Sequence, residues 1–303
     1  MSITHLRSIA ISAADPEQLL PFYEDIWGLR KVGTTGDGTI LLRANGEEHH
    51  VLALVPGPGH RMDGIGLGAS SPAYVDELAA ALVGSGVEPV SGPASRPPEL
   101  GGGYGVTFRD PEGRLIDVSA NVGTHEPFAA GTGPGPDRLS HVVLNCTSQA
   151  ASVEFYTTVL GFKVSDSYEN DLMVFLRCNQ LHHCVVMAPG RWTSLNHVAF
   201  EVASADEVMK ALGRMRKAGV DTIWGPGRHG PGGNVFCYFA DPVGNVIEYT
   251  AELLELDDSW EPQVWRRTPE NADVWGTSGG ITPDVIAAMS NPPAGALAEP
   301  ERS

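Results

Sequence analysis

The 303-residue sequence has no long hydrophobic run, no cysteine pair motif and no excess of positive charge. No stretch approaches the roughly 20 apolar residues that a membrane-spanning helix needs, so we expect no membrane association. The N-terminus lacks a basic segment followed by a long apolar one, and we expect no signal peptide. The formal net charge of -17 repels nucleic acid and anionic lipid, so neither is an expected partner.

The cysteines are few and unpaired in sequence. Cys146, Cys178, Cys184 and Cys237 all lie in the second half of the chain, and none belongs to a CxxC motif. Such spacing predicts neither a structural zinc site nor a disulfide framework, and reduced thiols fit a cytoplasmic protein. Turn residues are plentiful instead: 36 glycines and 23 prolines, as a chain of many short strands requires.

The chain contains an internal repeat. The segment FRDPEGRLIDVSA at 108–120 matches FADPVGNVIEYTA at 239–251. PFYEDIWGLRKV at 21–32 matches EFYTTVLGFKV at 154–164, and further matches follow in the same order in both halves. Self-similarity of this kind indicates a duplicated structural unit.

We therefore predict two copies of one domain, at 1–125 and 136–255, followed by a tail at 256–303. The segment GTGPGPD at 131–137 is rich in glycine and proline, which suits a linker. The end of the tail, NPPAGALAEPERS, has few large apolar residues and is expected to be disordered.

Each predicted domain holds a finer pattern of strand, helix and several more strands. The runs HVVLNC, HVAFEV, VFCYFAD and VIEYTAE are rich in Val, Phe and Tyr, which strands prefer. The stretch 148–160 begins at a serine cap, and 204–218 begins with Ser-Ala-Asp-Glu and ends before Gly219, as helices do. Two such modules in each domain predict an α+β fold of four βαβββ modules.

Three residues of the second predicted domain have the types that hold non-haem iron. His141, His197 and Glu248 stand at the starts or ends of apolar strands. Two histidines and one carboxylate, with open positions left over, form the ligand set of non-haem Fe(II) oxygenases. A lone histidine before a strand is more often an ordinary residue, but a carboxylate in an apolar strand is costly to bury, and a metal would remove that cost.

The first predicted domain serves as a control for this site. At the corresponding positions we place His5, Gly64 and Asp117. Because Gly64 has no side chain to offer, we expect the metal site in the second domain alone.

The DPxG turn followed by an apolar strand, together with the βαβββ pattern, resembles the vicinal oxygen chelate superfamily over all but the tail. The resemblance implies two tandem domains, each a curved, incompletely closed barrel around a metal. The order of motifs narrows it to the type I extradiol dioxygenases, including those acting on 2,3-dihydroxybiphenyl. That order is His141, the HH pair with His183, the NH of His197, the RH of His229, Tyr238, and the EY of Glu248.

The resemblance implies an oxidoreductase that inserts both atoms of O2 into a catechol-type ring. His183 would be the acid–base residue, while His229 and Tyr238 would hydrogen-bond the substrate oxygens. His182 and His183 are expected on a strand, so that only His183 enters the cavity. The metal would be Fe(II), with Mn(II) as the alternative because the same ligands accept both. The partners would be a catecholic substrate and O2, and the protein would be a homo-oligomer.

Other functions stay open at this point. Glyoxalases and metal-dependent resistance enzymes share the superfamily, but usually use four ligands rich in glutamate. Oxygenases acting on keto acids and non-catalytic small-molecule-binding proteins are further alternatives. None of these needs the trio of His183, His229 and Tyr238. The sequence names neither the catechol nor the bond that is cleaved.

Overall fold

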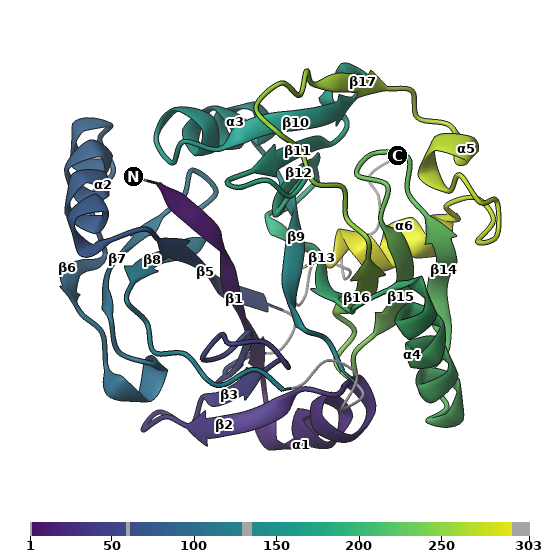
Figure 1. Ribbon diagram of the computed structural model, residues 1–303, viewed down its shortest axis with the longest axis horizontal. Helices are drawn as coiled ribbons and strands as arrows, with labels where there is room; N and C mark the ends of the chain where they lie inside the picture. The colour runs from purple at the N-terminus through teal and green to yellow at the C-terminus, as the bar shows by residue number, and fades with distance from the viewer. Residues whose placement is uncertain (1, 59–60, 129–134, 293–303) are drawn as a thin grey trace, which may run out of the picture.

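The computed structural model describes residues 2–58, 61–128 and 135–292, which form two mixed β-sheets with helices outside them (Figure 1). The predicted disorder of the last residues falls at 293–303, outside the described residues, as does most of the predicted linker. Across the described ranges, no helix is both long and apolar enough to cross a membrane.

The first sheet contains two βαβββ modules, and its strands lie in the order β2-β3-β4-β1-β5-β8-β7-β6. The first module consists of β1 (Ile3–Ala13), α1 (Pro16–Pro21), the π-helical turn η1 (Phe22–Trp27), β2 (Arg30–Thr34), β3 (Ile40–Arg43) and β4 (Leu52–Pro56). The second consists of β5 (Arg61–Ala69), α2 (Pro72–Gly84), β6 (Ser91–Ser95), η2 (Pro98–Leu100), β7 (Tyr104–Arg109) and β8 (Leu115–Ala120).

The second sheet repeats the arrangement, in the order β14-β15-β16-β13-β9-β12-β11-β10-β17. Its third module consists of β9 (Arg138–Cys146), α3 (Gln149–Thr158), β10 (Lys163–Tyr168), η3 (Glu169–Asp171), β11 (Val174–Arg177) and β12 (Val185–Pro189). The fourth consists of β13 (Ser194–Glu201), α4 (Ala205–Lys217), β14 (Thr222–Arg228), β15 (Val235–Ala240) and β16 (Val246–Ala251). The predicted α+β fold of four modules is confirmed, and each sheet is curved without closing.

The tail adds to the second sheet. It supplies the edge strand β17 (Gln263–Trp265), which pairs with β10, and then the helices α5 (Pro269–Ala272) and α6 (Pro283–Ser290). Figure 1 shows the tail running from β17 across to α5 and α6, within the second half of the molecule. The domain boundaries at 125, 136 and 255 remain predictions.

Capping explains the ends of the long helices. The Ser71 side chain accepts a hydrogen bond from the backbone of Tyr74 at the start of α2. The Ser204 side chain does the same for α4, accepting from the amide of Glu207. Serine at this position satisfies a backbone donor that the helix leaves free. Beyond α4, Gly219 has a φ of +76°, a left-handed conformation that glycine adopts readily.

The two halves hold each other through the same repeated motif. The hydroxyl of Tyr23, in the first half, donates to Asp241 in the DPVGN turn of the second half at 2.9 Å. Tyr156, its counterpart in the second half, lies with its hydroxyl 3.4 Å from Asp110 in the DPEGR turn of the first. Each domain thus places a tyrosine against the turn of the other.

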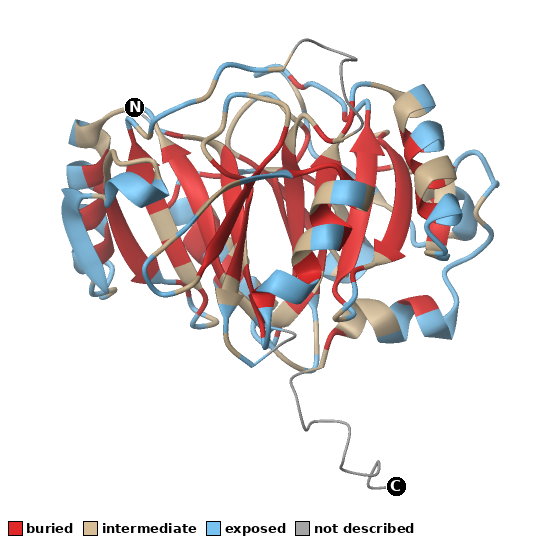
Figure 2. Cartoon of the chain, turned by 90° about the horizontal axis from the view of Figure 1, so that it is seen from below, coloured by how far each residue is buried: buried red, intermediate tan, exposed pale blue. Residues whose placement is uncertain are grey.

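Aromatic packing makes this contact part of the core. The Trp27 ring stacks on Tyr249 with 3.7 Å between ring centroids, and the Tyr249 hydroxyl donates to the Trp27 carbonyl at 2.5 Å. One apolar cluster contains residues from strands of both sheets. Figure 2 shows that the strands of both halves are largely buried. The two domains therefore form one body, and the site in the second is built on a rigid support.

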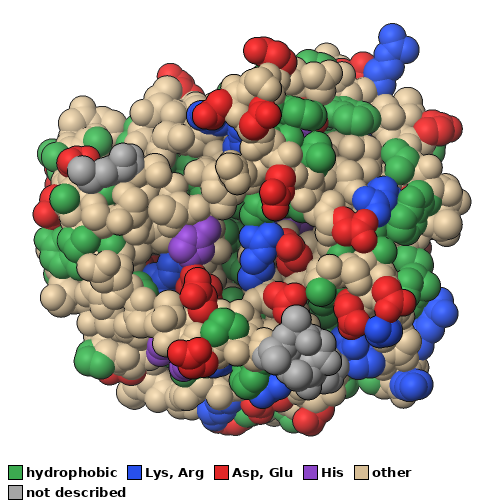
Figure 3. All heavy atoms as spheres, viewed as in Figure 1, with side chains coloured by type: hydrophobic (Ala, Val, Ile, Leu, Met, Phe, Trp, Pro, Cys, Tyr) green, Lys and Arg blue, Asp and Glu red, His purple; other side chains and the backbone are tan. Residues whose placement is uncertain are grey.

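Charged side chains of both signs lie on the surface of the molecule (Figure 3). On the face shown in Figure 3, acidic and basic side chains are interspersed, and the described residues there form no basic stripe.

Candidate active site

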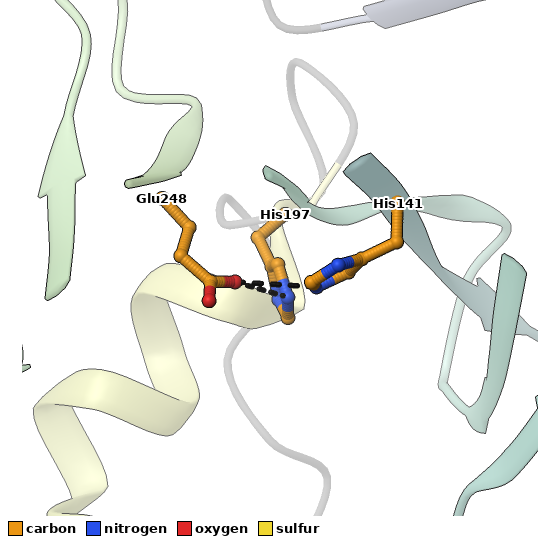
Figure 4. A group of neighbouring side chains, drawn as sticks. All are labelled: His141, His197 and Glu248. Atoms are coloured by element: carbon orange, nitrogen blue, oxygen red, sulfur yellow. Dashed lines mark ion pairs between the residues drawn. The ribbon is translucent and has the colours of Figure 1, made fainter. Parts of the chain in front are cut away.

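Three neighbouring strands at the centre of the second sheet bring the predicted metal ligands together. Ala199 of β13 lies opposite His141 of β9 on one side and opposite Glu248 of β16 on the other. His197 precedes Ala199 by two residues and so faces the same side of the sheet. Figure 4 shows both imidazoles and the carboxylate pointing toward one another.

The ligating atoms of these residues all lie within 4.8 Å of one another. The Nε2 atoms of His141 and His197 each lie 3.3 Å from Oε2 of Glu248. Within the described residues, this is the one group of three or more potential metal-binding side chains.

The three side chains are buried, and within the described residues two of their polar atoms lack a hydrogen-bond partner, whose place a bound metal ion would take. Glu248 is 0% exposed, and in the described structure its Oε2 and the Nε2 of His197 lack a hydrogen-bond partner. Burial alone would raise the pKa of the Glu248 carboxyl, but the two facing imidazoles hold that pKa well below its usual range. A buried anion with two nitrogen lone pairs beside it fits a divalent cation.

A chain of amide side chains fixes the orientation of His197. Nδ1 of His197 lies 2.8 Å from Oδ1 of Asn196, whose Nδ2 donates to Oδ1 of Asn145 at 3.0 Å. Asn145 in turn donates to the carbonyl of Met289, in α6, at 2.8 Å. An amide oxygen accepts from Nδ1, so Nε2 of His197 is left unprotonated for a metal, as outer partners of ligating histidines commonly ensure.

A cavity of about 470 Å³ opens beside this group. Its wall includes His141 and His197 together with all three residues assigned by resemblance, His183, His229 and Tyr238. Glu248 is not among the described residues that line the cavity. Tyr238 of β15 stands directly opposite Glu248 of β16, so the turn between these strands brings both to one place.

His229 and Tyr238 form a pair with a defined direction. Nδ1 of His229 lies 2.9 Å from the carbonyl oxygen of Ala272, which can only accept a hydrogen bond, so Nδ1 is the donor. Burial lowers the pKa of His229 to about 4, so the ring is neutral and its Nε2 is an acceptor. The Tyr238 hydroxyl, 2.9 Å from that Nε2, therefore donates to it. Burial also raises the pKa of Tyr238, which keeps this proton in place.

His183 stands beside His141, with 4.5 Å between the ring centroids. It is fully buried, and burial lowers its pKa well below the ordinary range, as do the neighbouring histidines. The prediction that His182 and His183 lie on a strand is wrong, because β12 begins at Val185. His183 is one of the described residues that line the cavity, and His182 is not.

Sequence reasoning missed several polar residues of the site. Asn145 and Asn196 interrupt apolar runs, the same signal that singled out Glu248. Asn234, which donates to Thr250 at 2.8 Å and lies 3.4 Å from Glu248, sits in the loop GPGGN, where glycine and proline mask it. The tail also reaches the cavity through Arg267, Thr268, Ala272, Ile281, Ile286, Met289 and Ser290.

Strand register corrects one counterpart in the first domain. In the first domain Ile9 pairs with Leu52, and Leu52 is two residues after His50. In the second domain Val142 pairs with Val185, which is two residues after His183, so Ile9 corresponds to Val142. The preceding residue, Ser8, therefore corresponds to His141, and the assignment of His5 is wrong.

His5 instead pairs with Glu48, with Nε2 and Oε1 2.6 Å apart. The other two assignments agree with the strand register. Gly64 pairs with Ala10 in the same way as His197 pairs with Val143, so Gly64 corresponds to His197. Asp117 pairs with Gly66 in the same way as Glu248 pairs with Ala199, so Asp117 corresponds to Glu248.

Fold and site together define a protein of paired βαβββ modules with a single candidate metal group in the described part of its second domain. The chain belongs to the Glyoxalase/Bleomycin resistance protein/Dioxygenase superfamily, whose family model matches residues 3–118 and 138–249.

Three similar proteins are named as a dioxygenase, a metapyrocatechase and a glyoxalase. The manganese-dependent 2,3-dihydroxybiphenyl 1,2-dioxygenase of Geobacillus genomosp. 3 is 28% identical, over 87% of this chain and 90% of that protein. Metapyrocatechase 2 of Cupriavidus necator is 32% identical, but the match spans 52% of this chain and only 55% of that protein. The crystal structure of a Mn(II)-bound glyoxalase from Novosphingobium aromaticivorans is 39% identical, covers 94% of both chains and superposes with a TM-score of 0.87.

Proposed function

We propose that this protein is an extradiol dioxygenase that opens a catechol-type ring with both atoms of O2 at an Fe(II) centre. His141, His197 and Glu248 would hold the metal. One observation carries the proposal: these three buried residues, with unpartnered atoms, adjoin a cavity that is also lined by His183 and Tyr238. The dioxygenase relatives that match most of the chain support the same class.

The ligand set leaves open positions for small molecules. A bound Fe(II) ion would bring the substrate oxygens and O2 together and pass charge between them. Mn(II) is the alternative occupant, since the same three ligand types accept it.

The chain supplies a base in His183. A buried imidazole whose pKa is held low is neutral, so it can accept a proton from a catechol hydroxyl entering the cavity. The nitrogen that takes this proton is Nε2, because Nδ1 is already engaged with His182 at 2.9 Å.

His229 and Tyr238 would position the substrate. In the free protein the Tyr238 hydroxyl donates to His229, and rotation of that hydroxyl would let it donate to a substrate oxygen instead. Phe175, Trp192 and Trp224 contribute aromatic walls to the cavity, which suit a planar ring and exclude water from it.

Oxygen uptake tests the proposal. Protein loaded with Fe(II) under anaerobic conditions is mixed with aerated solutions of a panel of catechols, and the yellow colour of a ring-opened product is followed. We expect oxygen consumption together with colour for at least one member. Protein with iron bound that consumes no oxygen with any of them would contradict the proposal.

A glyoxalase-type isomerisation is the second candidate, favoured by the name of the Novosphingobium structure. An isomerisation consumes no oxygen, so the same oxygen-uptake measurement distinguishes it from ring cleavage. Conversion of a thiol–aldehyde adduct without oxygen uptake would establish it, and would leave the roles of His183 and Tyr238 without a reaction.

We further propose that the protein is a cytoplasmic homo-oligomer. Light scattering after size-exclusion chromatography tests the assembly, and a mass equal to one chain would contradict it.

A further inference from the structure

Behind His183 lies a chain of three polar side chains that the proposed mechanism does not yet use. Nδ1 of His183 lies 2.9 Å from Nδ1 of His182. Nε2 of His182 lies 3.0 Å from Oδ2 of Asp166, in β10. Asp166 and His182 are at most 1% exposed, so solvent does not compete for these contacts.

The carboxylate gives the chain a direction. Hydrogen bonds from His182, the backbone N–H of Gln263 and Trp265 outweigh burial and keep the pKa of Asp166 below its ordinary value, so the group is an anion that can only accept hydrogen bonds. His182 therefore donates from Nε2 to this carboxylate, and in the tautomer that carries this single proton its Nδ1 is the acceptor. His183 must then donate from Nδ1, which leaves its Nε2 as the bare nitrogen available to the cavity.

The tail holds Asp166 in place. The backbone N–H of Gln263 donates to Oδ1 at 2.8 Å, and the Trp265 indole donates to Oδ2 at 2.7 Å. Both donors belong to β17, which runs parallel to β10. The carboxylate therefore receives hydrogen bonds from His182 on one side and from the tail on the other.

A glycine in the loop after His229 closes the other side of the histidine pair. Gly232 has a φ of +75°, and a Cβ built there would lie 3.1 Å from both Nδ1 of His182 and Cε1 of His183. The loop thus packs directly on the junction between the two rings. This close approach requires glycine, both for its conformation and for its lack of a side chain.

The first domain contains the same histidine pair without the carboxylate. His49 and His50 lie with their Nδ1 atoms 3.0 Å apart. Strand register places Gly33, opposite Leu41, where the second domain has Asp166, opposite Phe175. The carboxylate thus accompanies the domain with the candidate metal group and is absent from its counterpart.

We propose that Asp166 and His182 are positioning residues for ring cleavage, and that they hold His183 in the tautomer with a bare Nε2 facing the substrate. Trp265 of the tail is the outer support of this relay. The inference rests on the proposed function, in which His183 moves a substrate proton.

Kinetics of Asp166→Asn and His182→Gln, with His49→Gln as the matched control in the first domain, test the proposal. Loss of orientation should lower kcat by about 100-fold, the lower end of what a positioned acid–base group contributes. Metal content and KM should stay near the wild-type values, because neither residue is among the described residues that line the cavity. The control should match the wild type. Wild-type kcat in both relay variants would overturn the inference.

Ring-nitrogen NMR of histidine-labelled, Zn(II)-loaded protein gives a readout that needs no turnover. The His183 signal is identified by its loss in His183→Phe. We expect a proton on Nδ1 of His183 in the wild type and a shift toward the other tautomer in Asp166→Asn. A proton on Nε2 in the wild type would overturn the inference whatever the activity, whereas an inactive wild type with the expected tautomer would count against the proposed function alone.

Discussion

The two domains carry a carboxylate at the same strand position and neutralise it differently. In the second domain, the Glu248 carboxylate faces the imidazoles of His141 and His197, and no arginine of the described residues forms an ion pair with it. In the first, Asp117 accepts a hydrogen bond from the guanidinium of Arg96. Strand register shows that Arg96 corresponds to His229. Ser95 pairs with Tyr104 in the first domain in the same way as Arg228 pairs with Val235 in the second, and Arg96 and His229 are the next residues along the chain.

This difference shows how one fold keeps or loses a metal site. A carboxylate held in a cavity is stabilised by a cation, and the first domain provides one from its own chain: the partly exposed Asp117 forms an ion pair with Arg96. Arg96 also donates to Thr107, the counterpart of Tyr238, at 2.8 Å. The first domain thus retains a cavity of about 930 Å³. In it the Arg96 guanidinium pairs with the carboxylate, whereas in the second domain no side-chain cation of this kind pairs with Glu248 among the described residues.

The largest difference between the domains should appear on removing the carboxylates. Glu248→Gln is expected to abolish both metal binding and turnover, because the remaining amide cannot balance a divalent cation. Asp117→Asn should leave metal content and kcat unchanged, and so should His5→Ala. Metal analysis after dialysis, together with oxygen uptake, checks these outcomes. Loss of metal in Asp117→Asn would show that the first domain also binds it.

Removing the acid–base residue should separate metal binding from chemistry. His183→Phe should retain metal while kcat falls by about 100- to 10,000-fold, the usual contribution of a general acid–base group. His50→Phe, at the matching position of the first domain, should behave as the wild type. Normal turnover in His183→Phe would remove the role assigned to that residue.

A smaller effect is expected behind the metal ligands. Asn196→Ala removes the acceptor of His197 and should weaken metal affinity by about 10- to 100-fold, as loss of such outer partners does. Asp63→Ala changes the matching residue of the first domain and should leave affinity as it is. Titration with Mn(II) in each variant gives the comparison, and equal affinities would mean that Asn196 does not orient the ligand.

The smallest effect concerns the reciprocal contacts between domains. Tyr23→Phe removes a buried hydrogen bond to Asp241 and should lower the free energy of unfolding by about 1 kcal/mol. Tyr156→Phe should cost less, because Asp110 keeps its ion pair with Arg114 at 2.9 Å. Urea unfolding midpoints measure both, and an equal or larger loss for Tyr156→Phe would contradict this ranking.

Much of the architecture and the core of the site follow from the sequence, because both leave local signals. The repeat and the apolar strands predicted four modules, and polar residues in apolar strands marked His197 and Glu248. Strand register is not local: His5 has the residue type expected at the position that corresponds to His141, but bulges in β1 and the pairing with β4 put Ser8 at that position. Asp166 meets Trp265 across 99 residues, and no pattern in KVSDSY indicates it.

The most direct test of the central claim is turnover of a catechol under isotopically labelled dioxygen by the Fe(II)-loaded protein, with mass analysis of the ring-opened product. We predict that both oxygen atoms of one labelled molecule enter the product, and that Glu248→Gln yields none. A product formed without label, or with label from water alone, would contradict assignment of the second domain as an extradiol dioxygenase centre.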